Sequence, residues 1–170
     1  MTTQNTLLIP ASLIGLLCCL TFATASNSIN ANKLKRAYLD DKQNVHVVTV
    51  RDHHTQITNK RNSTELKLAP DNETVAWLAI NNWIAEADIK PGSEKLAIYR
   101  GGKIASIKCS PFIRDYWFWN DGRQVAIDCG GRHFAGREIL YDTATLKEVS
   151  SFDQNDVPLE KRPNWSNGDN

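Results

Sequence analysis

The sequence lacks the short motifs that mark most small enzymes. No serine stands in a G-x-S-x-G turn, no H-E-x-x-H pair is present, and no glycine-rich P-loop occurs. Cysteine is scarce, with 4 in 170 residues, and no two cysteines stand at the spacing that zinc sites prefer. We therefore expect no enzyme activity, no metal and no cofactor.

An excess of charge of either sign is also missing. Lys and Arg together number 20 and Asp and Glu 19, which leaves a net charge of +1. No basic stripe of the kind that binds nucleic acid runs along the chain. We expect no nucleic-acid partner.

Charge is absent altogether from the start of the chain, where the first charged side chain is Lys33. Residues 7–20 are almost wholly apolar, and small residues follow up to Ala25. This pattern predicts a signal peptide over residues 1–25, and hence a periplasmic or secreted protein with no membrane span after cleavage. The alternative is an uncleaved membrane anchor, for which the apolar stretch is only just long enough and contains Pro10.

Cleavage after Ala25 leaves two cysteines, Cys109 and Cys129. Two cysteines in an exported chain usually form one disulfide. Such a bond would close a loop of about 20 residues and stabilise the fold by roughly 3 kcal/mol. Two free, buried thiols are the alternative.

Long helical periodicity is missing as well, and apolar residues occur instead in short runs. Glu65–Leu68 alternates like a strand with one buried face, whereas Val75–Ile80 is apolar throughout and predicts a strand covered on both faces. Polar turn residues separate about ten such runs. The sequence therefore predicts an all-β fold, in which a hairpin from Val45 is followed by stacked four-stranded antiparallel meanders.

We expect this β-repeat domain to span residues 45–153. Residues 26–44 are polar and predict a tether, with at most a short helix around residues 34–39. Residues 154–170 contain two prolines and no apolar period, which predicts a flexible tail.

One short pattern occurs twice. Residues 70–80 read PDNETVAWLAI and residues 120–130 read NDGRQVAIDCG, so that in each a polar turn around an aspartate precedes an apolar run. A strand–turn–strand segment follows each of them, from Leu96 and from Ile139. A unit of roughly 45 residues used twice indicates a repeat protein whose units stack on one another.

Both units resemble the WD40-like β-propeller repeats of bacterial periplasmic proteins such as TolB. Residues 69–72 and 119–122 are similar to the family's Ser-Pro-Asp-Gly turn. Residues 140–147 are similar to its Leu-Tyr-Asp-x-x-Thr-Gly-Lys hairpin, with Leu146 in place of the glycine. The resemblance covers residues 65–152 and implies a partial propeller of about two and a half blades, or a two-sheet sandwich. Because propellers close with about four to eight blades, it also implies a protein partner or a homo-oligomer that covers the open edges.

The aromatic run Tyr116–Trp119 is one candidate binding site. Alternation along a strand places Trp117 and Trp119 on one face and Tyr116 on the other. One of these faces belongs to the core. The other is either buried by a second layer or exposed as an interaction patch, with Arg114 at its rim.

The loop of residues 130–137 is the other candidate. It carries His133 and Phe134 between glycines, and either Phe134 plugs the core or the loop is a recognition loop. The repeat places the loop around Trp83 at the same position of the first unit, so we expect the two loops to lie on one side. The predicted binding residues are Trp83, Arg114, Trp117, His133, Phe134 and Arg137.

The sequence therefore favours an exported, non-enzymatic β-repeat protein that binds another protein in the cell envelope. One alternative is a small periplasmic hydrolase or lyase that uses His133. Another is a structural subunit that completes a larger β assembly.

Overall fold

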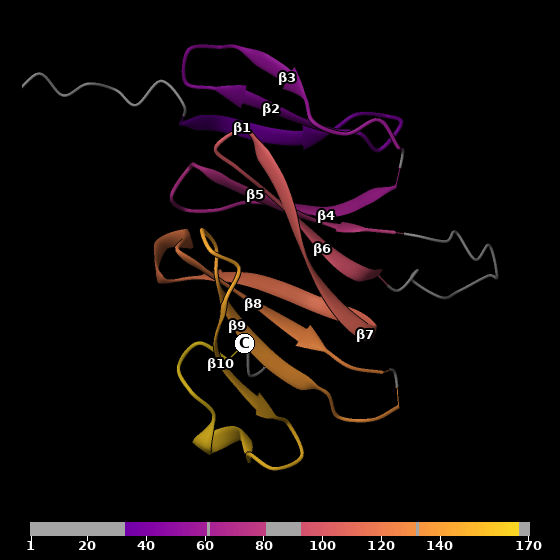
Figure 1. The fold of residues 1–170 in the computed structure, drawn as a ribbon, viewed down its shortest axis with the longest axis vertical. Helices are drawn as coiled ribbons and strands as arrows, with labels where there is room; N and C mark the ends of the chain where they lie inside the picture. The colour runs from indigo at the N-terminus through magenta and orange to yellow at the C-terminus, as the bar shows by residue number, and fades with distance from the viewer. Residues whose placement is uncertain (1–32, 61, 81–92, 132, 167–170) are drawn as a thin grey trace, which may run out of the picture.

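The computed structural model describes residues 33–60, 62–80, 93–131 and 133–166, and Figure 1 shows them as strands joined by turns. The predicted all-β fold is confirmed. Within these ranges no helix is long and apolar enough to cross a membrane. The described elements are β1 (Leu34–Leu39), β2 (Val45–Thr49), β3 (His54–Gln56), β4 (Ser63–Leu68), β5 (Thr74–Ala79), β6 (Ser93–Arg100), β7 (Lys103–Trp119), the short 3-10 helix η1 (Asn120–Gly122), β8 (Gln124–Cys129), β9 (Arg137–Asp142), β10 (Glu148–Asp153) and the 3-10 helix η2 (Leu159–Lys161).

The strands form two antiparallel sheets, one with the order β1-β2-β3 and one with the order β10-β9-β8-β7-β6-β5-β4. The long strand β7 belongs to two units of the larger sheet. Residues 103–108 pair with β6, and residues 113–119 pair with β8. A cis peptide bond between Ser110 and Pro111 lies between these halves. Each predicted meander therefore has four strands and shares β7 with the other.

The sheets follow one another along the long axis of the molecule in Figure 1, and strand β5 lies in the middle of this stack. Val75 and Trp77 pack against the β1–β3 sheet, whereas Ala76 and Leu78 pack against the second unit. This two-sided burial explains why the apolar run of β5 does not alternate.

Equivalent turns of the two units touch each other. A Cβ atom built on Gly122 would lie 3.0 Å from Ala69 Cβ and 3.0 Å from the main-chain nitrogen of Asp71, in the turn between β4 and β5. Gly122 also has a φ of +86°, which favours glycine. The turns that carry the repeated pattern therefore lie on one side of the stack, as a repeat requires.

Tyr116 joins the second unit to the first. Its side chain is fully buried, and its hydroxyl group lies within hydrogen-bond distance of the main-chain oxygens of Glu65 and Ala76, at 2.8 Å from the latter. Burial, reinforced by the negative charges of Glu65 and Asp115, raises the pKa of this phenol. The group therefore stays a neutral donor to the backbone of the neighbouring unit.

The predicted tether is wrong for the described residues from Lys33 onward. Residues 34–39 form strand β1 rather than a coil or a short helix, and Leu34, Ala37 and Leu39 pack into the core between the sheets. A bulge at the start of β1 breaks the alternation of its apolar residues. The pattern therefore did not look like a strand.

The predicted flexible tail is also wrong for residues 154–166. Trp165 is buried against Ala126 and Leu140 on the outer face of the second unit, and Trp117 Nε1 donates a 2.8 Å hydrogen bond to the Trp165 carbonyl oxygen. The tail thus covers the sheet face on which no further unit packs in the described chain. A single tryptophan has no sequence period that could predict this contact.

Substitution of Gly122 by alanine should destabilise the stack more than the same change at Gly102. Both glycines have similar positive φ angles, of +86° and +79°, but a Cβ atom at Gly102 meets nothing within 4 Å. We expect Gly122→Ala to cost about 2 kcal/mol more than Gly102→Ala, because it forces the two turns apart. Urea unfolding of both variants measures the difference, and equal free energies would show that the turns do not touch.

The change Tyr116→Phe should lower the free energy of unfolding by about 1–3 kcal/mol, because it leaves buried carbonyl oxygens without their donor. Tyr141→Phe is the matched control, at a half-buried tyrosine whose hydroxyl group has no hydrogen bond within the described residues. This control should change the stability by less than about 0.5 kcal/mol. Chemical denaturation checks both values, and an equal effect of the two changes would contradict the assigned role of Tyr116.

Candidate functional site

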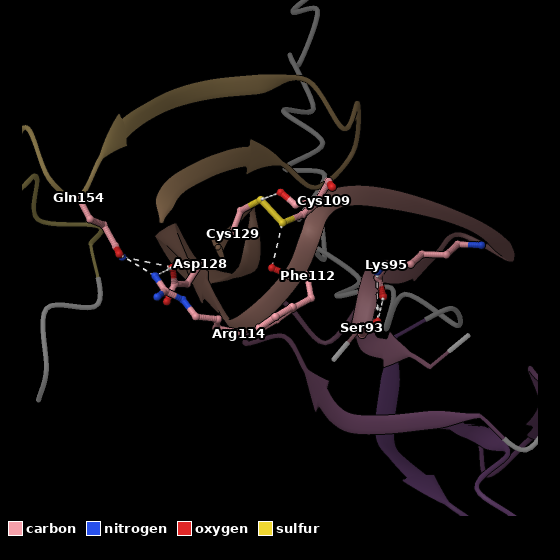
Figure 2. Close-up of a disulfide and its surroundings, with 9 residues drawn as sticks. Ser93, Lys95, Cys109, Phe112, Arg114, Asp128, Cys129 and Gln154 are labelled. Atoms are coloured by element: carbon pink, nitrogen blue, oxygen red, sulfur yellow. Dashed lines mark hydrogen bonds and ion pairs between the residues drawn. A yellow bond between two sulfur atoms is a disulfide. The ribbon is translucent and has the colours of Figure 1, made fainter. Parts of the chain in front are cut away.

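The loop between β8 and β9 starts at a disulfide bond. Cys109 in the first half of β7 and Cys129 at the end of β8 are joined, with their Cα atoms 5.8 Å apart, as Figure 2 shows. The predicted disulfide is therefore present, and the alternative of two free thiols is wrong. Directly after it, Gly130 donates a 3.1 Å main-chain hydrogen bond to the carbonyl oxygen of Phe112. The disulfide and this bond tie the start of the loop to β7.

Arg114 of β7 holds the loop through hydrogen bonds to its backbone. Its Nη1 atom donates to the carbonyl oxygens of Gly131 and Phe134, both at 3.3 Å. Its Nη2 atom donates to Asp128 Oδ1 and Gln154 Oε1, both at 2.6 Å (Figure 2). A planar guanidinium group is suited to such a fixed set of acceptors. Arg114, expected at the rim of a patch, is instead the residue that positions this loop.

The glycines of the loop permit its tight packing. A Cβ atom on Gly131 would lie 2.1 Å from Cε1 of Phe134, and one on Gly136 would lie 2.3 Å from the carbonyl oxygen of Cys129. Gly136 also donates its main-chain N–H to Gln154 Oε1 at 3.0 Å. Backbone and ring can therefore approach closely only because these positions lack side chains.

The tip of the loop faces the solvent. The Phe134 side chain is 59% exposed, and His133 is exposed beside it. The alternative in which Phe134 plugs the core is therefore wrong. An exposed aromatic ring on a loop with a fixed backbone is a feature of binding surfaces, because little conformational entropy is lost when a partner contacts it.

The other predicted binding residues lie in different surroundings. Trp117 is half-buried under the tail, next to Trp165, whereas Trp119 on the same face of the aromatic run is 40% exposed. The tail therefore covers only part of that face. Arg137 is exposed and pairs with Glu148 Oε1 at 3.0 Å on β10. Trp83 lies outside the described residues, and its place in the binding surface stays a prediction.

The strands that flank the two predicted loops do meet. Ser93, which follows the undescribed residues 81–92, is paired with Ile113 in β7, and Ile113 is also paired with Cys129 on its other side. The start of β6, which follows residues 81–92, and the end of β8, which precedes the loop of residues 130–136, therefore lie at the same end of the larger sheet. This agrees with the repeat alignment.

A polar cleft of about 390 Å³ lies beside the loop and was not predicted. Its lining includes Glu138, which is 1% exposed. Glu138 Oε1 accepts a hydrogen bond from Gln154 Nε2 at 3.0 Å and forms an ion pair with Arg162 Nη1 at 3.6 Å. Gln154 and Arg162 come from the segment taken for a flexible tail. The complete lining is Arg114, Asp115, Trp117, Asp128, Glu138, Gln154 and Arg162.

No family model matches the chain, and no curated protein matches it. Among solved structures, the chain is similar to the β-propeller domain of the Trilobed protease from Pyrococcus furiosus, which has an open velcro topology. The identity is 17% and the TM-score 0.46, over 76% of this chain and 38% of that chain. The chain thus spans well under half the length of that structure.

Replacement of both Cys109 and Cys129 by serine should lower the free energy of unfolding by about 3 kcal/mol, the value expected when a closed loop of this length is opened. The cysteines are separated by 20 positions. Urea unfolding should give the same loss for the wild-type protein in a reducing buffer. A stability that responds to neither change would contradict a structural role of the bond.

Proposed function

We propose that this chain is an exported, non-enzymatic β-repeat protein that binds another protein of the cell envelope through the loop of residues 130–136. The observation that carries the proposal is the exposed ring of Phe134 on a loop whose described backbone is hydrogen-bonded at Gly130, Gly131, Phe134 and Gly136. Arg114 bonds this backbone at two carbonyl oxygens, and the disulfide at Cys129 closes its base. Pre-organised aromatic side chains of this kind dominate the energetics of protein interfaces.

Two features support export. The apolar leader over residues 1–25 has the composition of a signal peptide. The bond between Cys109 and Cys129 is of a type that persists mainly in oxidising compartments. The resemblance of residues 65–152 to TolB-type repeats favours the bacterial periplasm as that compartment.

Two features support a role in protein binding rather than catalysis. The sequence contains no G-x-S-x-G turn, no H-E-x-x-H pair and no P-loop. Asp128, a carboxylate close to the loop, is bonded to Arg114 and Gln154, so it is already engaged in holding the loop.

The change Phe134→Ala tests the proposal. The purified chain is immobilised, an envelope extract is passed over it, and the bound proteins are quantified by mass spectrometry. We expect a partner that binds the wild-type chain at least about tenfold more tightly than the variant, as loss of an aromatic anchor predicts. Val149→Ala is the matched control, because Val149 is 51% exposed on β10, away from the loop. It should retain the partner.

The change Arg114→Lys tests whether binding depends on the position of the loop, because it alters the support of the loop without changing any residue in it. Lysine keeps the charge but cannot bond four acceptors in one plane. We expect this variant to bind the same partner more weakly than the wild-type chain, although Phe134 is intact. A monomeric mass with no partner retained, or a partner that Phe134→Ala leaves unaffected, would contradict the proposal.

A further inference from the structure

Among the described residues, the first sheet has one strand fewer than each of the two units of the larger sheet. The two units of the larger sheet each hold four strands, whereas the first sheet holds only β1, β2 and β3 in the described part of the chain. The missing position can be identified by matching the first sheet with the next unit.

β1 corresponds to β5. The main-chain nitrogen of Leu34, at the start of β1, donates a 2.6 Å hydrogen bond to the carbonyl oxygen of Asn72, in the turn from which β5 starts. At the same end of the stack, His53 of the β2–β3 turn and Gly101 of the β6–β7 turn line one hollow. The strands β1, β2 and β3 therefore match β5, β6 and the first half of β7. The counterpart of β4 is the strand that the described chain lacks, and its place is along the free edge of β1.

The corresponding edges elsewhere are occupied or blunted. In β4 the carbonyl oxygen of Glu65 is engaged by the Tyr116 hydroxyl group, and Lys67 reaches Asp115 at 3.2 Å. The edge strand β10 has a bulge and an acidic residue at each end. Like β4 and β10, β1 has no strand paired to its outer edge within the described residues. It also has a bulge, between Leu34 and Arg36, but its exposed charged side chains, Lys35 and Arg36, are basic.

The surroundings of this edge are basic. Arg36 is exposed in β1 and lies over the ring of Tyr38, at 5.1 Å from its centroid. Exposed Arg51 lies close by, because Val50 donates its main-chain N–H to the carbonyl oxygen of Lys33 at 2.9 Å. Asp52 pairs with Lys35 at 2.8 Å, and the hydrogen bond from Lys35, together with the charges of Lys35 and nearby Arg36, lowers the pKa of the Asp52 carboxyl. Basic side chains still outnumber Asp52 at this end of β1, namely Lys33, Lys35, Arg36 and Arg51.

We propose that the edge of β1 binds an extended, acidic segment of a partner protein, which adds to the first sheet as an antiparallel fourth strand. Main-chain hydrogen bonds to β1 provide the affinity, as in other cases of strand addition. Carboxylates on the incoming strand, opposite Arg36 and near Arg51, provide the charge preference. This surface is separate from the loop of residues 130–136, so the inference does not depend on the function proposed for that loop.

A defined peptide tests this proposal on the full chain. The probe has ten residues in which glutamate alternates with valine or threonine, and its affinity is measured by fluorescence anisotropy, with hydrogen exchange of the β1 amides as the structural readout. We expect the peptide to protect amides of β1. N-methylation of alternate peptide nitrogens, which removes the donors of one strand edge, should weaken binding at least tenfold.

Charge reversal separates the contribution of the side-chain charges from that of the main-chain hydrogen bonds. Arg36→Glu should lower the affinity for the glutamate peptide about tenfold. It should raise the affinity for the same peptide with lysine in place of glutamate. Lys147→Glu, an equal charge change at an exposed residue of the β9–β10 turn, should change neither. Phe134→Ala should also leave peptide binding unchanged.

Several outcomes would overturn the proposal. One is an N-methylated peptide that binds as tightly as the unmodified one, and another is the absence of binding to the acidic peptide. A third is protection of the β1 edge before peptide is added. Protection that rises with protein concentration would assign the edge to a second copy, and protection independent of concentration would assign it to the chain's own residues.

Discussion

The burial of β5 on both faces is the constraint on which the rest of the structure depends. A strand with Val75 and Trp77 on one face and Ala76 and Leu78 on the other needs an apolar layer on each side. The β1–β3 sheet supplies one layer and the second unit supplies the other. The second unit has an outer face of its own, and Trp165 from the end of the chain covers it. The molecule is thus a series of sheets in which each apolar face is closed by the next element of the chain.

The candidate loop is held in place by contacts with both units of this stack. Arg114 lies in the half of β7 that belongs to the second unit, and Cys109 lies in the half that belongs to the first. The loop is therefore fixed to both units, through the disulfide and through the guanidinium group. Phe134 can stay exposed at the tip because neither anchor requires its ring to be buried.

The sequence predicted those features that depend on neighbouring residues. Leu66 and Leu68 of β4 pack into the same core cluster, as their alternation predicted, although a bulge interrupts the strand and its residues after Ser63 are all half-buried. The continuous apolar run of β5 and the turns of the repeat are also local patterns, and both appear in the structure. Leu146 has a φ of +56° at the position where the resembled family carries glycine, so the resemblance located the turn even though the residue differs.

Features that depend on distant residues were not predictable in this way. The sequence does not indicate strand β1, because its bulge and the adjacent charges of Lys35 and Arg36 interrupt the alternation of apolar residues. The role of Arg114 depends on Gln154, 40 positions away. No sequence period indicates such a contact, because it arises only when the tail folds back over the second unit.

Amide hydrogen exchange at Gly130 and Gly136 tests the central claim most directly, namely that the stack holds the loop in one conformation. Both N–H groups donate hydrogen bonds, to the carbonyl oxygen of Phe112 at 3.1 Å and to Gln154 Oε1 at 3.0 Å. We expect them to exchange slowly, at rates close to those of strand β8, and to lose this protection in Arg114→Lys. Exchange of both amides at the rate of an unstructured peptide in the wild-type chain would contradict the account.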